Sequence, residues 1–172
     1  VRGESRAEIA WLLVPAVIIL ALDLGIDLKS GPAWARVKEQ APEGGVTVRA
    51  NAKQFNWEFT YPGPDGRFET QDDLTLENEL HVPQSQNVHL ELRSKDVIHS
   101  FFVPTLRLKQ DILPGRMIKA WFNATATGEY EIGCAELCGF GHYTMRGFLN
   151  VHDAADYARW TAERWPTAAK AS

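Results

Sequence analysis

The stretch CAELCGFGHYTM, residues 134–145, gathers two cysteines, one histidine and one methionine into a single short segment. Thiolate, imidazole and thioether side chains together favour copper, and the methionine is the most informative because zinc and hard cations have little use for it. One cysteine followed by histidine and methionine would indicate a mononuclear blue-copper loop. With both Cys134 and Cys138 present, two bridging sulfurs could hold two metal ions, and each ion would need its own imidazole.

A second histidine has to come from elsewhere in the chain, because His142 is the one histidine inside this loop. His99, in DVIHSFFVP, follows a predicted strand and lies 35 residues before Cys134. A β-sandwich could bring it beside the loop. The remaining histidines are predicted to be ordinary residues in or near strands rather than ligands. They are His81, His89 and His152.

Two other interpretations of the same side chains remain. Cys134 and Cys138 could form a disulfide, or they could bind a single zinc together with His99 and His142. The spacing C-x3-C is a weak signal by itself. The methionine, the glycines at 139 and 141 and the upstream DVIHSF favour copper over both alternatives.

The sequence around the loop predicts a mainly β domain. Turn residues, such as PGPDG at 62–66, separate short segments that are rich in β-branched and aromatic residues. These segments are 46–50, 55–61, 76–82, 87–94, 117–124, 129–134 and 147–152. About seven such strands indicate a sandwich or barrel of about 110 residues.

A short helix is predicted after the last strand. Asp153 can cap the sequence AADYARWTAERW, and Tyr157, Trp160 and Thr161 would share one helical face that could pack on the domain. We expect the tail to fray at Pro166.

The segment IAWLLVPAVIILAL, residues 9–22, contains no charged side chain. It reaches roughly 18 residues if it is counted from Ala7 to Leu24, which is marginal for a membrane span. A signal peptide and a buried core helix are the alternatives, but LDLGIDLKSG offers no convincing cleavage site. We therefore predict a transmembrane helix.

Positive charge predicts the orientation of that helix. Arg2 and Arg6 precede the apolar run and Lys29 follows it, so the amino end should stay inside and the main domain should be extracytoplasmic. The segment 30–45, rich in Pro, Gly and charge, is predicted to be a linker. The expected divisions are a transmembrane helix with flanks at 1–29, the linker at 30–45, the β domain at 46–152, and a helix with a tail at 153–172.

The overall composition excludes several classes of protein. The chain has 172 residues, is 45% hydrophobic and carries a net charge of −4. These values argue against a disordered or collagen-like chain and against a nucleic-acid binder. Two cysteines are too few for a disulfide scaffold.

Three motifs, DVIHSFFVP, LKQDILPGR and CAELCGFGHYTM, together resemble subunit II of the haem-copper cytochrome c oxidases. The resemblance runs from about Glu8 to the last helix. It implies a cupredoxin-like Greek-key β-sandwich with an N-terminal transmembrane helix and a short C-terminal helix. It also implies a dinuclear copper centre, CuA. The ligands it implies are His99, Cys134, the backbone carbonyl of Glu136, Cys138, His142 and Met145.

The resemblance also implies a function. CuA would accept single electrons from a cytochrome c-type donor and pass them to the haem of subunit I, where oxygen is reduced to water with proton translocation. The chain would lie in the bacterial inner membrane with other oxidase subunits, its copper domain on the periplasmic side. A nitric oxide reductase could use such a subunit too. Nitrous oxide reductases add a propeller and typically carry Trp at the position of Glu136, and quinol-oxidising relatives lack the cysteines.

Further residues have roles that the same resemblance implies. The Glu136 side chain would reach a magnesium ion shared with subunit I, and Asp111 would lie near that interface. Glu8 would help to admit protons, although a carboxylate at a helix end is the plainer interpretation.

One departure from the family concerns the electron donor. Phe55 occupies the position at which mitochondrial-type members present a Trp that accepts the electron, and Trp57 lies two residues on, on the same strand face. Trp57 could substitute for it or could belong to the core. The donor could also be a different cytochrome, fused or held in a larger complex, or another small electron carrier. An acidic segment could steer a basic cytochrome or could be a solvated face. Its members are Glu69, Asp72, Asp73, Glu77 and Glu79.

Overall fold

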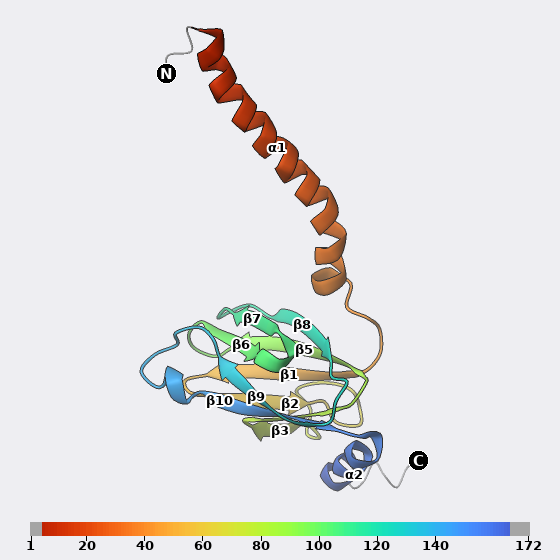
Figure 1. Cartoon of the computed structure of the whole chain (residues 1–172). Helices are drawn as coiled ribbons and strands as arrows, with labels where there is room; N and C mark the ends of the chain where they lie inside the picture. The colour runs from red at the N-terminus through yellow and green to blue at the C-terminus, as the bar shows by residue number, and fades with distance from the viewer. Residues whose placement is uncertain (1–4, 166–172) are drawn as a thin grey trace. The chain divides into compact units, whose positions relative to one another are not determined.

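A computed structural model describes residues 5–165 of the chain (Figure 1). The chain divides into two compact units, Val1–Ala41 and Pro42–Ser172, and each is described by itself. Arg2 and Pro166, which entered the predictions above, lie outside the described residues.

The first unit is a long helix. Helix α1 runs from Arg6 to Trp34 and continues as the π-helical turn η1, Ala35–Glu39. Ser5 caps it, because its Oγ accepts a hydrogen bond from the Glu8 N–H at 3.2 Å. Its most apolar window has a mean hydropathy of 2.5, so by length and composition it is able to cross a membrane. At 1.5 Å per residue the helix is about 50 Å long, more than the roughly 30 Å of a hydrocarbon core.

The segment 30–45, expected to be a linker, is helical as far as Glu39. Pro32 lies inside α1 at the loss of one backbone hydrogen bond. The residues that follow Pro32 include Ala, Arg, Lys and Glu, which are good helix formers and offset that loss. The break falls instead at residues 40–45, where two glycines have positive φ, Gly44 at 75° and Gly45 at 97°.

The second unit is a sandwich of two five-stranded sheets (Figure 1). The first sheet has the order β3 (Leu74–Glu77), β2 (Asn56–Tyr61), β1 (Val46–Lys53), β5 (Asn87–Ser94) and β8 (Ile118–Asn123). The second has the order β4 (Glu79–Pro83), β10 (Arg146–His152), β9 (Gly128–Cys134), β6 (His99–Val103) and β7 (Leu108–Ile112). The pairs β1–β5 and β4–β10 are parallel, and the other pairs are antiparallel. The predicted mainly β sandwich is confirmed.

Alternation along the strands creates the core. In β5, for example, Val88, Leu90 and Leu92 are buried, while the residues between them are only partly covered. The second sheet contributes Leu80, Phe101, Ile132 and Leu149, all 0% exposed. The core therefore fills the space between the two sheets.

The predicted strand at 76–82 is two strands in different sheets. Asn78 separates β3 from β4 with φ at 59°, a left-handed conformation that Asn tolerates better than most residues. Its N–H donates to the Trp57 carbonyl at 2.8 Å and its Oδ1 accepts from the Trp57 N–H at 2.9 Å. Asn78 thus carries the chain from one sheet to the other.

Strands β6 and β7 are absent from the sequence-based prediction. Four of the five residues of β6 are buried, so it lacks the alternation that marks a half-exposed strand. Strand β7, LKQDI, is largely polar. Consequently His99 is the first residue of a strand of its own.

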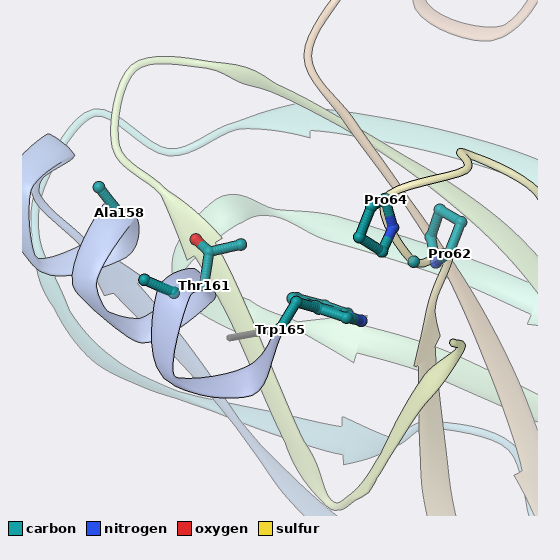
Figure 2. Close-up of a pocket in the computed structure, with 7 residues that line it drawn as sticks. Pro62, Pro64, Ala158, Thr161 and Trp165 are labelled. Atoms are coloured by element: carbon teal, nitrogen blue, oxygen red, sulfur yellow. The ribbon is translucent and has the colours of Figure 1, made fainter. Parts of the chain in front are cut away.

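Helix α2, Ala154–Arg164, closes one end of the sandwich. The Asp153 carboxylate accepts from the Asp156 N–H at 2.8 Å, as the capping prediction requires. Trp160 is 8% exposed and packs edge-on against Tyr61 at 5.3 Å between ring centroids. Figure 2 shows a small apolar pocket beside this helix, between Trp165 and the prolines at 62 and 64.

Candidate metal centre

The sulfur-containing loop leaves the second sheet at the end of β9. Cys134 ends β9 and pairs with Phe101 of β6, and the Ala135 N–H donates to the Ser100 carbonyl at 3.0 Å. This pairing places Cys134 beside His99. The loop then passes through the 3-10 turn η3, His142–Thr144, before β10 begins.

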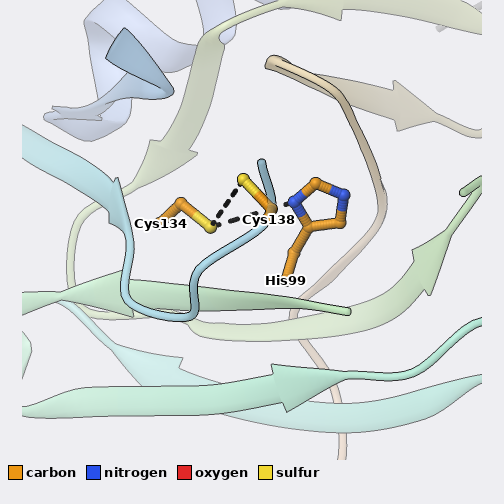
Figure 3. A group of neighbouring side chains, drawn as sticks. All are labelled: His99, Cys134 and Cys138. Atoms are coloured by element: carbon orange, nitrogen blue, oxygen red, sulfur yellow. Dashed lines mark hydrogen bonds between the residues drawn. The ribbon is translucent and has the colours of Figure 1, made fainter. Parts of the chain in front are cut away.

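His99, Cys134 and Cys138 form a compact group (Figure 3). Cys134 Sγ lies 3.8 Å from His99 Nδ1 and 3.8 Å from Cys138 Sγ. On the other side, Cys138 Sγ lies 3.6 Å from His142 Nδ1. Each thiol therefore has a different imidazole beside it.

The two remaining predicted ligand groups lie at the same place. Met145 Sδ is 3.8 Å from Cys138 Sγ, and the Glu136 carbonyl oxygen is 3.2 Å from Cys134 Sγ. The structure thus brings together all six groups that the resemblance implies, from β6, β9 and one loop.

The donor set fits copper. The two sulfurs lie 3.8 Å apart and are not joined in a disulfide, whose S–S bond is about 2.05 Å, so both cysteines are free thiols. Soft sulfur with imidazole nitrogen is the combination that copper favours. With Met145 Sδ and the Glu136 carbonyl beside them, the thiols and imidazoles make six donor groups, more than the four that one structural zinc takes. His99 is 0% exposed, Cys138 3% and Met145 2%, so these three groups are closed to water, whereas Cys134 and His142 are partly exposed.

The acid–base properties of the group follow from this packing. Burial is the largest single influence and would raise the pKa of the Cys134 thiol, but hydrogen bonds with His99, Ser100, Glu136 and His142 together lower the pKa to about 6. Burial, reinforced by the neighbouring Cys134 charge, raises the pKa of Cys138. One thiol is therefore more readily deprotonated than the other.

Asp96 orients His99 from behind. The His99 Nε2–H donates to Asp96 Oδ1 at 2.8 Å. A carboxylate only accepts hydrogen bonds, so this contact keeps the proton on Nε2 and leaves Nδ1 to face Cys134. Burial works to lower the pKa of His99, whereas its bonds to Cys134 and Asp96 raise it above the ordinary value.

The two aromatic candidates for electron transfer occupy different environments. Trp57 is 0% exposed, and its ring lies edge-on to the His99 ring at 6.3 Å between centroids. Phe55 is half-buried, and its ring packs against the loop at Gly139 and Gly141. Trp57 is thus a core residue next to a candidate ligand, and Phe55 is nearer the surface.

Asp111 lies close to the same end of the second sheet. Its Oδ1 accepts hydrogen bonds from Lys109 Nζ and Ser100 Oγ, both at 2.7 Å. The Lys109 ammonium is the main reason that the pKa of Asp111 is lowered. Glu136 is exposed, and its negative charge helps to raise the pKa of Lys109, after the larger effect of Asp111.

The other histidines have partners elsewhere. His81 Nδ1 and His152 Nε2 lie 2.8 Å apart next to α2, and His89 Nε2 lies 2.9 Å from the Gly44 carbonyl. In the acidic segment, Glu69 pairs with Arg49 at 3.0 Å and Glu77 with Lys53 at 3.7 Å.

Two residues at the centre were missed by sequence reasoning. Asp96 stands three positions before His99, and a carboxylate near a predicted ligand histidine is a signal that could have found it. Gln54, whose Nε2 donates to the Cys138 carbonyl, gave no such signal.

A β-sandwich with a Cys–Cys–His–Met loop and a histidine from a neighbouring strand has the architecture of the cupredoxin type, and its donor groups could hold copper. Residues 46–151 match the family described as Cytochrome C oxidase subunit II, periplasmic domain. The chain belongs to this family. The sequence-based resemblance is thereby confirmed.

Individual relatives agree with the family. The chain is 35% identical to the alternative cytochrome c oxidase subunit 2 of Bradyrhizobium diazoefficiens over 183 aligned positions. The alignment covers 94% of this chain and 65% of the relative. The crystal structure of the periplasmic domain of subunit II of cytochrome oxidase (CoxB) of Bradyrhizobium japonicum is similar with a TM-score of 0.64 and 28% identity. It covers 74% of this chain and 98% of that one.

A second similar structure captures a mixed disulfide intermediate between a thioredoxin-like protein and subunit II of cytochrome c oxidase. It has a TM-score of 0.60 and 29% identity, covering 72% of this chain and 94% of that one. The chain spans between about a third and about two thirds of the length of curated relatives, with 65%, 39% and 34% for three of them. Helix α1 and the match to a periplasmic domain fit a membrane-anchored protein with an extracytoplasmic domain.

Proposed function

We propose that this chain is subunit II of a haem-copper cytochrome c oxidase and that it holds a dinuclear CuA centre. In this role it accepts single electrons from a cytochrome c-type donor. It passes them to the haem of subunit I, where oxygen is reduced to water with proton translocation. The observation that carries the proposal is the pair of thiols 3.8 Å apart, each with its own imidazole nitrogen at 3.6–3.8 Å.

The division of the ligands between two ions is the one that the family resemblance implies, and the structure supports it by placing all of these groups around the two sulfurs. Cys134 and Cys138 would bridge the two ions. His99 and Met145 would complete one ion, and His142 with the Glu136 carbonyl would complete the other. When bound, the pair of ions would supply a one-electron redox couple that is shared between two metals.

The protein's own contribution is a rigid, dry frame. His99 heads a strand with Asp96 behind it, and Met145 is buried where β10 begins. Ligands that are fixed by packing and by hydrogen bonds change position little between oxidation states, and burial of the sulfurs tunes the potential.

The surface of the loop supports contact with protein partners. Leu137 is 77% exposed, Phe140 94% and Tyr143 78%. Large apolar side chains that are exposed together are typical of interaction sites. We propose that partners on this side include subunit I, to which Glu136 would offer its carboxylate for a shared magnesium ion, with Asp111 nearby.

The arrival of electrons is proposed to involve Phe55. Its half-buried ring touches the loop glycines, whereas the buried Trp57 can act only from within, beside His99. The donor remains a cytochrome c-type protein in this proposal. The same proposal places α1 in the bacterial inner membrane, with the copper domain on the periplasmic side and Glu8 near the proton-uptake side.

Metal content tests this function directly. The full chain is purified in detergent and its cysteine thiols are reduced before copper is added. It should then bind two copper ions and give an intense visible absorption. Zinc offered in competition should not displace them. A colourless chain that retains one zinc, or one without free thiols, would contradict the proposal and favour a structural site.

A related role is suggested by the similar structure that captures a mixed disulfide between a thioredoxin-like protein and subunit II of cytochrome c oxidase. We propose that an external two-electron oxidant, such as molecular oxygen, can join the thiols of Cys134 and Cys138, 3.8 Å apart, into a disulfide, and that a thioredoxin-like protein reduces this disulfide before copper binds. The partner's thiolate would attack one sulfur to form a mixed disulfide, and its second thiol would release the chain with both cysteines reduced. The half-exposed Cys134 supports such attack. An oxidised chain that regains copper binding only after this reduction would support the role, and one that never forms the disulfide would exclude it.

A further inference from the structure

The turn between β1 and β2 reaches the sulfur-containing loop from the opposite sheet. Lys53 pairs with Asn56, so Gln54 and Phe55 form the two residues of the turn. Gln54 Nε2 donates a hydrogen bond to the Cys138 carbonyl, across 84 residues of sequence. The side chain of one turn residue therefore holds the backbone of a candidate ligand.

Phe55 reinforces this contact. A Cβ built on Gly139 would lie 3.2 Å from the Phe55 ring, and one built on Gly141 would clash with it. Gly139 also has φ at 134°, a conformation that other residues rarely adopt. The glycines of the loop are thus needed for the close approach of the turn.

The same turn is tied to His99. Asp96 Oδ2 accepts a hydrogen bond from the Gln54 N–H at 2.7 Å, while Asp96 Oδ1 accepts from His99 Nε2–H at 2.8 Å and from the Val97 N–H at 2.7 Å. One carboxylate therefore connects the turn with the histidine that faces Cys134. These bonds keep the pKa of Asp96 low even though burial opposes them, so the carboxylate stays charged.

We propose that Gln54 is a positioning residue that clamps the loop at Cys138 to His99, the first residue of β6, through Asp96. The inference rests on the proposed copper function. His99 and Cys138 are 39 positions apart and belong to different segments, and the chain of contacts His99–Asp96–Gln54–Cys138 joins them without involving a metal. The clamp presets the separation of the two sulfurs and the first imidazole before copper binds.

The sharpest test replaces Gln54 with leucine in the full chain. Gln54→Leu keeps the backbone N–H that binds Asp96 but removes the donor to Cys138. Without copper, the backbone amides of His142 and Thr144, which donate to Gly139 and Gly141 at 3.1 and 3.0 Å, should exchange with solvent roughly fivefold faster. With copper, release to a chelator should be about five- to tenfold faster, because outer contacts hold ligands in place.

Gln84→Leu is the matched control. Gln84 Nε2 also donates to a backbone carbonyl, that of Thr125 at 2.7 Å, but in a loop that carries no candidate ligand. It should leave both exchange in the loop and copper release unchanged. Gln54→Asn, which keeps an amide on a shorter side chain, should give an intermediate release rate.

The outcomes separate this inference from the function on which it rests. If the unaltered chain binds no copper, the proposed function fails, while the metal-free exchange data still report on the clamp. If the unaltered chain binds copper but Gln54→Leu shows the same loop exchange and the same release rate, the clamp is wrong and the function stands.

Discussion

The sandwich carries a pair of histidines at each end, and the two pairs differ in what each ring faces. At the loop end, His99 and His142 each direct Nδ1 at a different thiol. At the α2 end, His81 and His152 face each other at 2.8 Å, and the His81 ring stacks on Trp160 at 4.9 Å between centroids. Identical side chains therefore serve as candidate ligands at one end and as packing residues at the other, and their neighbours decide which.

The largest effect on copper binding should come from a substitution at the loop end of the sandwich. Cys138→Ser removes the thiol that contacts Cys134, His142 and Met145 at 3.6–3.8 Å. We expect complete loss of the dinuclear copper spectrum, because serine oxygen is a poor ligand for soft copper. Visible and electron paramagnetic resonance spectra would check it, with circular dichroism to show an intact fold. A dinuclear spectrum that survives would make the ligand assignment wrong.

Breaking the α2 end should instead affect stability. Trp160→Ala removes a ring that is 8% exposed and stacks on His81, so the free energy of unfolding should fall by about 3 kcal/mol. The copper spectrum should be unchanged, since β2 and β10 separate the two ends by about 20 Å.

Chemical denaturation measures this loss. Tyr143→Ala is the control at the other end, because its side chain is 78% exposed and its removal should cost under roughly 0.5 kcal/mol. Equal losses for the two variants would contradict the assignment of Trp160 to packing.

The comparison also explains what the sequence could and could not predict. Cys134, Cys138, His142 and Met145 are predictable because they are neighbours in sequence and chemically distinctive. His99 is distant in sequence and was predicted from the need for a second imidazole and from its place after a predicted strand. Strand β6, which begins with it, was missed because nearly all of its residues are buried and no alternation marks it.

Long-range contacts were beyond sequence reasoning for a physical reason. Nothing in the sequence links Gln54 with Cys138, because their contact forms only when the sandwich brings a turn of one sheet against a loop of the other. The helical stretch after Pro32 was missed because proline and glycine indicated a linker. The residues that follow Pro32 are mostly good helix formers, and they favoured a helix.

A subtler change at the loop end should tune the site without emptying it. Met145→Leu nearly conserves volume at a residue that is 2% exposed, so the fold should be retained. The thioether is lost, and we expect copper to stay bound with an altered reduction potential and a changed electron-transfer rate. A spectroelectrochemical titration measures this. Leu149→Met, an equally buried swap on β10, should leave the potential unchanged, and identical potentials for all three proteins would contradict a role for Met145.

The smallest effect should be a pH dependence of the α2 end. Burial is the main cause that lowers the pKa of His81; His152 and Arg164 add to it, and Glu79 opposes it. The unfolded chain therefore takes up this proton at a higher pH than the folded chain. The contribution of His81 to the free energy of unfolding is complete above about pH 6.5 and is lost as pH falls toward the lowered pKa.

Denaturation between pH 7.5 and pH 5 checks this sign. His81→Asn should lose less stability over that range than the unaltered chain. His89→Asn is the control, because that histidine contacts the Gly44 carbonyl and lies outside the pair. A slope for His81→Asn equal to that of the unaltered chain would remove His81 as the source.

The most direct test of the account is the electron paramagnetic resonance spectrum of the copper-loaded full chain. A single unpaired electron that couples equally to two copper nuclei is the predicted result, because both thiols and one imidazole on each side already lie in place. Coupling to one copper nucleus, or two independent copper signals, would contradict a shared centre at Cys134 and Cys138.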